Sequence, residues 1–127
     1  MKNTAFHAEF RLRDEKPPLL IEIGARLAGD LIPILVEMST GVNMLEASLS
    51  CAVAENYEYK MRQNGVYAIR FIEDSLLLPK LRNLKKEAQA QYDIELYPIS
   101  KGGGRLGHII VKGNSIEDTE AKMNLCS

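Results

Sequence analysis

Residues 6–26 read FHAEFRLRDEKPPLLIEIGAR, two stretches of alternating character separated by a charged segment that ends in two prolines. In residues 5–12 the polar side chains of His7, Glu9 and Arg11 take odd-numbered positions. In residues 19–27 the parity is reversed, and the polar face carries Glu22, Gly24 and Arg26. Strict alternation is typical of half-buried strands, and a charged segment with prolines is typical of a turn. The stretch therefore predicts a β-hairpin with its turn in residues 13–18.

The two glutamates of this hairpin are expected on the same face of the sheet. A turn centred between Glu15 and Lys16 places Glu9 opposite Glu22 and His7 opposite Gly24, and a shift by two residues along one strand keeps the glutamates neighbours. Like charges that face each other destabilise a sheet, and a divalent cation removes the repulsion. Carboxylate oxygens are ligands that Mg²⁺ prefers. An ordinary solvated polar face remains the alternative, although glycine at position 24 favours close approach of a ligand or another backbone.

The rest of the chain alternates helices and strands, which gives an α+β fold class. Asp30 is the expected N-cap of a helix over residues 31–40, with Pro33 in its first turn and Gly41 at its end. Asn43 and Ser115 are the expected N-caps of helices over residues 44–55 and 116–126. We also expect a helix over residues 75–92, strands over residues 66–72, 94–99 and 108–113, and a loop over residues 101–107.

Composition excludes several classes of function. The chain has 127 residues, a formal net charge of −1, no Trp and 6% aromatic residues, so neither a basic stripe nor a stacking platform for nucleic acid is expected. No apolar run reaches transmembrane length, and no signal-peptide pattern precedes the first strand. Two cysteines make no disulfide framework, so we expect a cytoplasmic protein in a reducing compartment.

Residues 6–55 resemble the carboxyl half of the ATP-grasp catalytic domain, in particular that of biotin-carboxylase-like and amino-acid-ligase-like carboxylate–amine ligases. The family pattern is a strand with a metal-binding Glu, a Glu-Ile-Asn-Pro-Arg-like strand, a Gly-Gly-Asp-like turn and a Thr-Gly-Val-Asp-like phrase. This chain matches it with Glu9, then residues 22–26 (EIGAR), residues 28–30 (AGD) and residues 40–43 (TGVN). Residues 67–74, 94–99, 101–113 and 115–123 resemble the lid-like C-terminal subdomain of the same ligases. The resemblance implies two domains, residues 1–58 and 59–127.

The resemblance also implies an activity and a site. An ATP-grasp ligase uses ATP to convert a carboxylate to an acyl phosphate, which an amine or a thiol then attacks. Glu9 and Glu22 would hold Mg²⁺, with Mn²⁺ as an alternative. Arg26 would be catalytic by stabilising the phosphoryl group, and His7, Glu9, Glu22 and Arg26 would contact the magnesium–ATP complex. The partners implied are ATP and a small carboxylate substrate.

Two features distinguish the chain from the family pattern. Gly24 stands where the family has Asn, a further metal ligand, which leaves open whether one or two metal ions bind. The family holds the adenine and phosphates mainly with an earlier subdomain that this sequence does not contain. We therefore expect the isolated chain to be inactive. We also expect it to self-associate, for example as a homodimer, either through the exposed edge of its first strand or through the uncovered apolar face formed by Phe6, Phe10, Ile21 and Ile23. A non-catalytic binding or dimerisation module that keeps the fold is the alternative.

Weaker signals have simpler interpretations. His7 shares the face of Glu9 and either contacts a phosphate or serves only the surface. Asp30 either caps a helix or orients Arg26. Residues 101–108 lack the Walker pattern and are better interpreted as a hairpin tip than as a phosphate loop. The basic residues of the helix at 75–92 read as its solvated side; they are Lys80, Arg82, Lys85 and Lys86.

Overall fold

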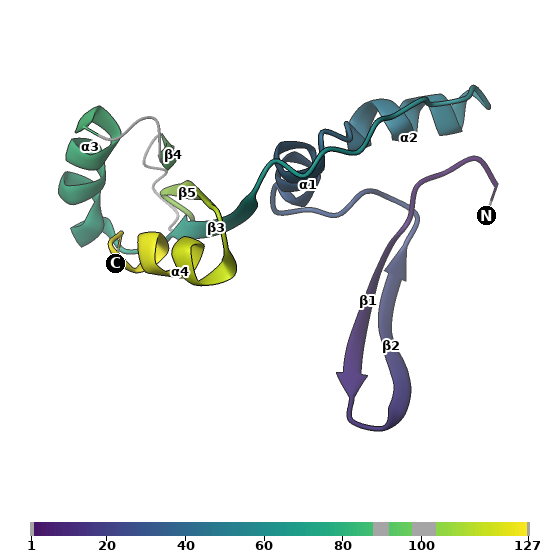
Figure 1. The fold of residues 1–127 in the computed structure, drawn as a ribbon, viewed down its shortest axis with the longest axis horizontal. Coiled ribbons are helices and arrows are strands. Elements are labelled where there is room, and N and C mark those ends of the chain that lie inside the picture. Colours follow the sequence, from purple (N-terminus) through teal and green to yellow (C-terminus); the bar gives the residue numbers. More distant parts are fainter. Residues whose placement is uncertain (1, 88–91, 98–103, 127) are drawn as a thin grey trace. The chain divides into compact units, whose positions relative to one another are not determined.

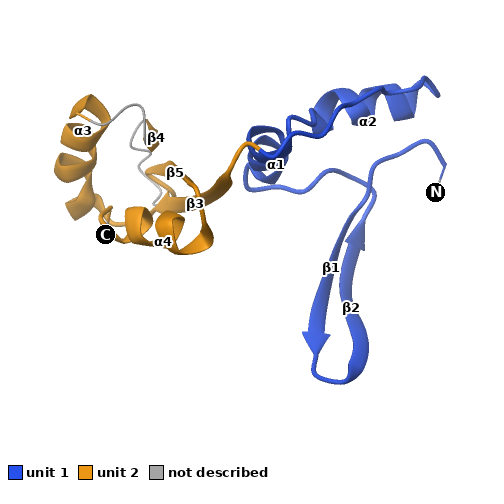
Figure 2. Ribbon diagram, viewed as in Figure 1, with its two compact units in different colours: residues 1–63 blue, residues 64–127 orange. Residues whose placement is uncertain are grey.

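The computed structural model describes residues 2–87, 92–97 and 104–126. The chain forms two compact units, residues 1–63 and residues 64–127 (Figure 2). The first unit contains an antiparallel hairpin and two helices, and the second contains a three-stranded antiparallel sheet with its helices (Figure 1). The α+β fold class is confirmed. None of the described helices combines the length and the apolar character that a bilayer crossing requires.

The first unit begins with the expected hairpin, formed by β1 (His7–Arg13) and β2 (Lys16–Gly24). Its turn is Asp14–Glu15, with Glu15 in the left-handed region at φ 53°, so the predicted six-residue turn is wrong. Both prolines lie at the start of β2, where their missing N–H groups are tolerated on a two-stranded edge. The strand starts three residues earlier than expected and ends at Gly24, not at Leu27.

The hairpin ladder contains two irregularities, between Glu9 and Phe10 and between Arg11 and Arg13. At the first, Ile21 has no partner, so Phe10 pairs with Leu20 and Arg11 pairs with Leu19. Strict alternation over residues 19–27 would put Leu19 on the same face as Ile23. The structure does not keep this alternation, because the extra residue of a bulge reverses the faces of the residues that follow it.

Helices α1 (Ile32–Thr40) and α2 (Met44–Ala52) complete the described elements of the first unit. Asp30 does not cap α1, which corrects the prediction. Asp30 and Leu31 both have left-handed backbone, at φ 54° and 61°, and Leu31 is the N-cap residue. A tight turn sets this geometry, with the Ile32 N–H donating to the Gly29 carbonyl at 3.0 Å. The N-cap position is therefore occupied by Leu31, whose side chain has no hydrogen-bond acceptor.

The other predicted boundaries of these helices are confirmed or nearly so. Pro33 lies in the first turn of α1, and Gly41 ends it at φ 75° while its N–H donates to the Glu37 carbonyl at 2.7 Å. The Asn43 side chain accepts the Glu46 N–H at 2.9 Å and caps α2. The helix then ends at Ala52, three residues before the predicted end at Glu55.

The second unit is a sheet with strand order β3–β5–β4, formed by β3 (Val66–Ile72), β5 (Gly107–Gly113) and β4 (Tyr92–Leu96). A 3₁₀ turn, η1 (Ser75–Leu77), leads into α3 (Leu78–Glu87), and α4 (Ile116–Asn124) follows β5. The predicted strand at 66–72 is confirmed. Residues 88–91 of the predicted helix and residues 98–103 of the predicted strand and loop lie outside the described residues.

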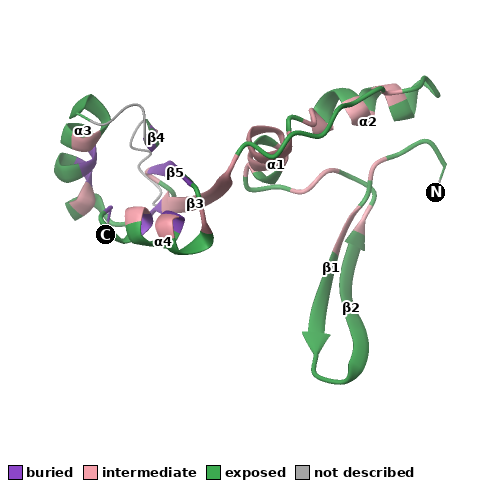
Figure 3. Ribbon diagram, in the orientation of Figure 1, coloured by how far each residue is buried: buried purple, intermediate pink, exposed green. Residues whose placement is uncertain are grey.

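The apolar core belongs to the second unit (Figure 3). Alternate residues of the three strands pack there against α3 and α4. The buried members are Ile72, Leu78, Leu81, Tyr92, Ile94, Ile109, Val111, Met123 and Cys126. Burial raises the pKa of the Cys126 thiol, and likewise that of the Tyr92 hydroxyl. By contrast, every described residue of the first unit is at least partly exposed.

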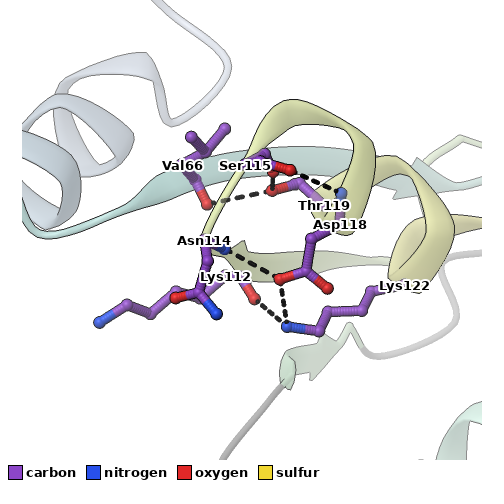
Figure 4. Close-up of polar contacts among 7 residues, drawn as sticks. All are labelled: Val66, Lys112, Asn114, Ser115, Asp118, Thr119 and Lys122. Atoms are coloured by element: carbon purple, nitrogen blue, oxygen red, sulfur yellow. Dashed lines mark hydrogen bonds and ion pairs between the residues drawn. The ribbon is translucent and has the colours of Figure 1, made fainter.

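The turn from β5 into α4 is held by a compact polar network (Figure 4). Ser115 accepts the Asp118 N–H at 3.2 Å, which confirms the predicted N-cap. The Asp118 carboxylate accepts the Asn114 N–H at 2.9 Å and pairs with the Lys122 ammonium at 2.9 Å. Thr119 packs so closely against Gly113 that a Cβ there would collide with its hydroxyl, so this position requires glycine.

Candidate functional site

The carboxylates of the hairpin lie face to face. Glu9 pairs with Glu22 across the β1–β2 ladder, and His7 pairs with Gly24 two positions along. This is the register that the sequence predicted. The observed turn is centred one residue before the predicted one, between Asp14 and Glu15. Each of the two ladder irregularities shifts the pairing by one residue, and together they restore the predicted pairing at Glu9 and Glu22. The alternation of the first strand then brings His7 and Glu9 to the same face.

Three side chains on this face could hold one metal ion. A ring nitrogen of His7 and one carboxylate oxygen each from Glu9 and Glu22 all lie within 4.8 Å of one another. His7 is half-buried, and both glutamates are exposed. Ligand atoms about 2.1 Å from a common cation are separated by about 3 Å when adjacent and about 4.2 Å when opposite. The donor set therefore fits a divalent cation after small movements of the side chains.

In the described part of the chain, neither the Glu9 nor the Glu22 carboxylate takes part in an ion pair or a hydrogen bond. Other acidic side chains of the described residues do have such partners, among them Glu95 with His108 and Asp118 with Lys122. Adjacent carboxylates without a cation repel each other. The cluster of His7, Glu9 and Glu22 is therefore open to an external cation.

Arg26 lies outside the strand on which it was expected. β2 ends at Gly24, and Arg26 follows in a bend, where one guanidinium nitrogen, Nη1, donates to the Leu27 carbonyl at 3.0 Å. Its side chain nevertheless lies against the end of β2, next to Gly24. A Cβ built on Gly24 would lie 3.6 Å from Arg26 Cγ and 3.7 Å from its Nε. Because that Cβ would point to the face of Glu22, Arg26 lies beside the carboxylate cluster.

Two other sequence signals belong to the second unit. Residues 101–103 of the predicted hairpin tip lie outside the described residues, and beside them the Tyr97 N–H donates to the Leu106 carbonyl at 2.8 Å. Lys80, Arg82, Lys85 and Lys86 are all exposed on or beside α3, as predicted for a solvated side.

Sequence reasoning did not single out His108, which is buried and contacts Tyr97. Its Nδ1 lies 2.7 Å from the Tyr97 hydroxyl and 3.9 Å from a Glu95 oxygen. Alternation in the strand at 108–113 would assign His108 to one face of that strand. It would not reveal the contact with Tyr97, which joins residues 11 positions apart and has no signal in local sequence.

Comparison with solved structures identifies proteins of the same architecture. Phosphoribosylglycinamide synthetase from Anaerococcus prevotii superposes with a TM-score of 0.69 at 17% identity, over 98% of this chain and 35% of that one. L-amino acid ligase from Bacillus licheniformis gives 0.67 at 23% identity, over 94% and 33%. N5-carboxyaminoimidazole synthetase from Staphylococcus aureus complexed with ADP gives 0.69 at 15% identity, over 95% and 32%.

These similarities extend along almost the whole of this chain, which spans about a third of the length of each structure it matches (32–35%). No protein-family model matches the sequence, and no curated protein matches it. At such identities the likeness establishes the fold. The chain therefore has the fold of the C-terminal portion of an ATP-grasp ligase.

Proposed function

We propose that this chain is part of an ATP-dependent carboxylate–amine or carboxylate–thiol ligase and supplies the metal-binding carboxylates of its active site. The observation that carries the proposal is the direct pairing of Glu9 with Glu22 on a hairpin of ATP-grasp architecture. Exposed, adjacent carboxylates without a cation are costly, so their arrangement favours a charged ligand.

In the proposed site, Glu9 and Glu22 would hold Mg²⁺ together with the phosphates of ATP. Mg²⁺ is usually bound in this way, by one or two carboxylates together with substrate phosphates. When bound, the cation offsets the negative charge that develops on the phosphoryl group.

Arg26 contributes a second positive charge from the same side. Its guanidinium offers a planar set of donors that matches phosphate oxygens, and its only partner found in the described residues, the Leu27 carbonyl, leaves several of them available. Arg26 would bind the transferring phosphoryl group and then the phosphate of the acyl phosphate. Preorganised donors of this kind act where charge develops and need no rearrangement during the reaction.

The reaction proposed has two balanced steps. The substrate carboxylate attacks the γ-phosphorus of ATP, which forms an acyl phosphate and releases ADP. The nucleophile, an amine or a thiol, then attacks the acyl carbon, inorganic phosphate leaves and the proton of the nucleophile passes to solvent. The residues of this chain position the phosphates in both steps.

The proposal is tested in the complete protein that carries this chain, by measuring phosphate release against magnesium concentration. Glu22→Gln preserves shape but removes charge, and should lower turnover on the order of 10²-fold or more. Glu15→Gln is the matched control, because Glu15 lies in the turn of the same hairpin. If the Glu22 variant kept normal turnover at low magnesium, the chain would be better described as a binding module with a ligase fold.

A further inference from the structure

The position opposite His7 in the hairpin has no side chain, because it is Gly24. The neighbouring space on that strand is filled by the stem of Arg26, with its Cγ 3.6 Å from the place of a Cβ. Position 24 therefore offers no side-chain ligand atom. His7 faces this position from β1, with a ring nitrogen within 4.8 Å of an oxygen of Glu9 and of Glu22.

We propose that His7 is the third protein ligand of the metal and occupies the coordination position that Gly24 leaves empty. The proposal rests on the proposed function, since it takes Glu9 and Glu22 as the other two ligands. It changes the donor set from oxygen alone to one imidazole nitrogen and two carboxylate oxygens.

The donor set determines which metal is preferred. Mg²⁺ favours oxygen ligands throughout, whereas divalent transition metals accept imidazole together with carboxylate. Mn²⁺ accepts both donor types and tolerates the same phosphate ligands as Mg²⁺. The site should therefore bind Mn²⁺ more tightly than Mg²⁺, and this preference should depend on His7.

The geometry explains why His7 is available. His7 and Glu9 are two residues apart on one strand, so both project from the same face. In the part of the chain that the structure describes, His7 forms no side-chain hydrogen bond or ion pair that would fix its ring elsewhere. The other histidine of the sequence, His108, is buried and contacts Tyr97, so it has a structural partner already.

The test uses the 127-residue chain without nucleotide. Mn²⁺ binding is followed by the loss of the free-ion paramagnetic resonance signal, and electron spin echo modulation detects nitrogen bound directly to the ion. We expect modulation from ¹⁴N that changes when the chain is labelled with ¹⁵N-histidine, a measurement that needs no variant. His7→Gln should abolish the modulation and weaken Mn²⁺ binding by at least about tenfold, since loss of an outer-shell partner alone costs about 10–100-fold. Mg²⁺ binding should change less.

Three results would overturn the proposal: Mn²⁺ bound without nitrogen modulation, equal Mn²⁺ affinity in the wild type and His7→Gln, or no binding of millimolar Mn²⁺. Mn²⁺ binding by Glu22→Gln distinguishes a failure of the His7 proposal from a failure of the proposed function. If Glu22→Gln loses Mn²⁺ while His7→Gln does not, the carboxylate site stands and His7 is a surface residue. If neither variant alters binding, the hairpin holds no metal and both proposals fail.

Discussion

The side chain of Arg26 lies over Gly24, with its Cγ 3.6 Å and its Nε 3.7 Å from the place where a Cβ would stand. A Cβ at position 24 would therefore make an ordinary van der Waals contact with Arg26, and only side-chain atoms beyond the Cβ would compete with the guanidinium for space. A larger residue at this position would have to displace Arg26 or share the space with it.

Replacement of Arg26 by Lys should lower turnover of the complete ligase by about 10²-fold and leave the fold intact. An ammonium is a point charge and cannot reproduce the planar, paired donors of a guanidinium. Steady-state kinetics should show the loss mainly in kcat if Arg26 acts on the transferring group. Arg13→Lys is the control, because Arg13 lies on the same hairpin and donates to the Pro17 carbonyl. Equal kinetics for the two variants would remove Arg26 from the site.

Glu22→Gln should stabilise the hairpin of the metal-free chain by about 0.2–1 kcal/mol, because it removes a repulsive cross-strand pair. Hydrogen exchange of the β1 and β2 amides measures this locally. The gain should shrink in 1 M salt, where charges are screened within about 3 Å. Glu15→Gln, in the turn, should show a smaller effect. Unchanged or faster exchange in the Glu22 variant would mean that the two carboxylates do not repel each other.

Asp118→Asn should destabilise the second unit at neutral pH. The N–H of Asn114 and the ammonium of Lys122 hold the pKa of the Asp118 carboxyl below its ordinary value of 3.8. A depressed pKa contributes stability that is present above the ordinary pKa and is lost as the pH falls through the lowered one. The difference between wild type and variant, measured by circular dichroism during denaturation, should therefore vanish in acid. Glu120→Gln, on the same helix, is the control at neutral pH. A constant difference across the whole range would contradict this account.

The isolated chain should self-associate through its hairpin. Several large apolar side chains there are mostly exposed, among them Phe6 at 64%, Phe10 at 55% and Ile21 at 59%. Exposed apolar surface and unpaired strand edges both favour association. Sedimentation velocity over a dilution series should show it, and Phe10→Lys should shift the distribution toward monomer. Leu76→Lys, which alters an exposed residue of the second unit, should not. A monomer at every concentration would disprove this prediction.

The pairing of Glu9 with Glu22 could be predicted because alternation fixes the face of each residue and the two strands have opposite parity. The turn could not be predicted in the same way. Its true position at Asp14–Glu15 is compatible with that pairing only through two ladder irregularities. One of them leaves Ile21 without a partner in the run Leu19-Leu20-Ile21, where every residue is apolar, so no change of pattern marks the bulge.

Helix ends could be predicted where local hydrogen bonds set them, and could not where other parts of the structure did. Gly41, Asn43 and Ser115 act through hydrogen bonds to residues within four positions, and local sequence was sufficient to identify them. Asp30 failed because a preceding turn placed both it and Leu31 in left-handed backbone. The end of β2 at Gly24 and the return of Arg26 over that glycine also depend on three-dimensional packing, which alternation does not encode.

The distribution of buried residues separates two properties that many enzymes combine. The proposed ligands lie in residues 7–26, where no described side chain is fully buried, whereas the core lies entirely in the second unit. Substitutions at His7, Glu9, Glu22 or Arg26 should therefore change the free energy of unfolding little. In evolutionary terms, such a hairpin can exchange its metal or its substrate while the second unit preserves a foldable chain.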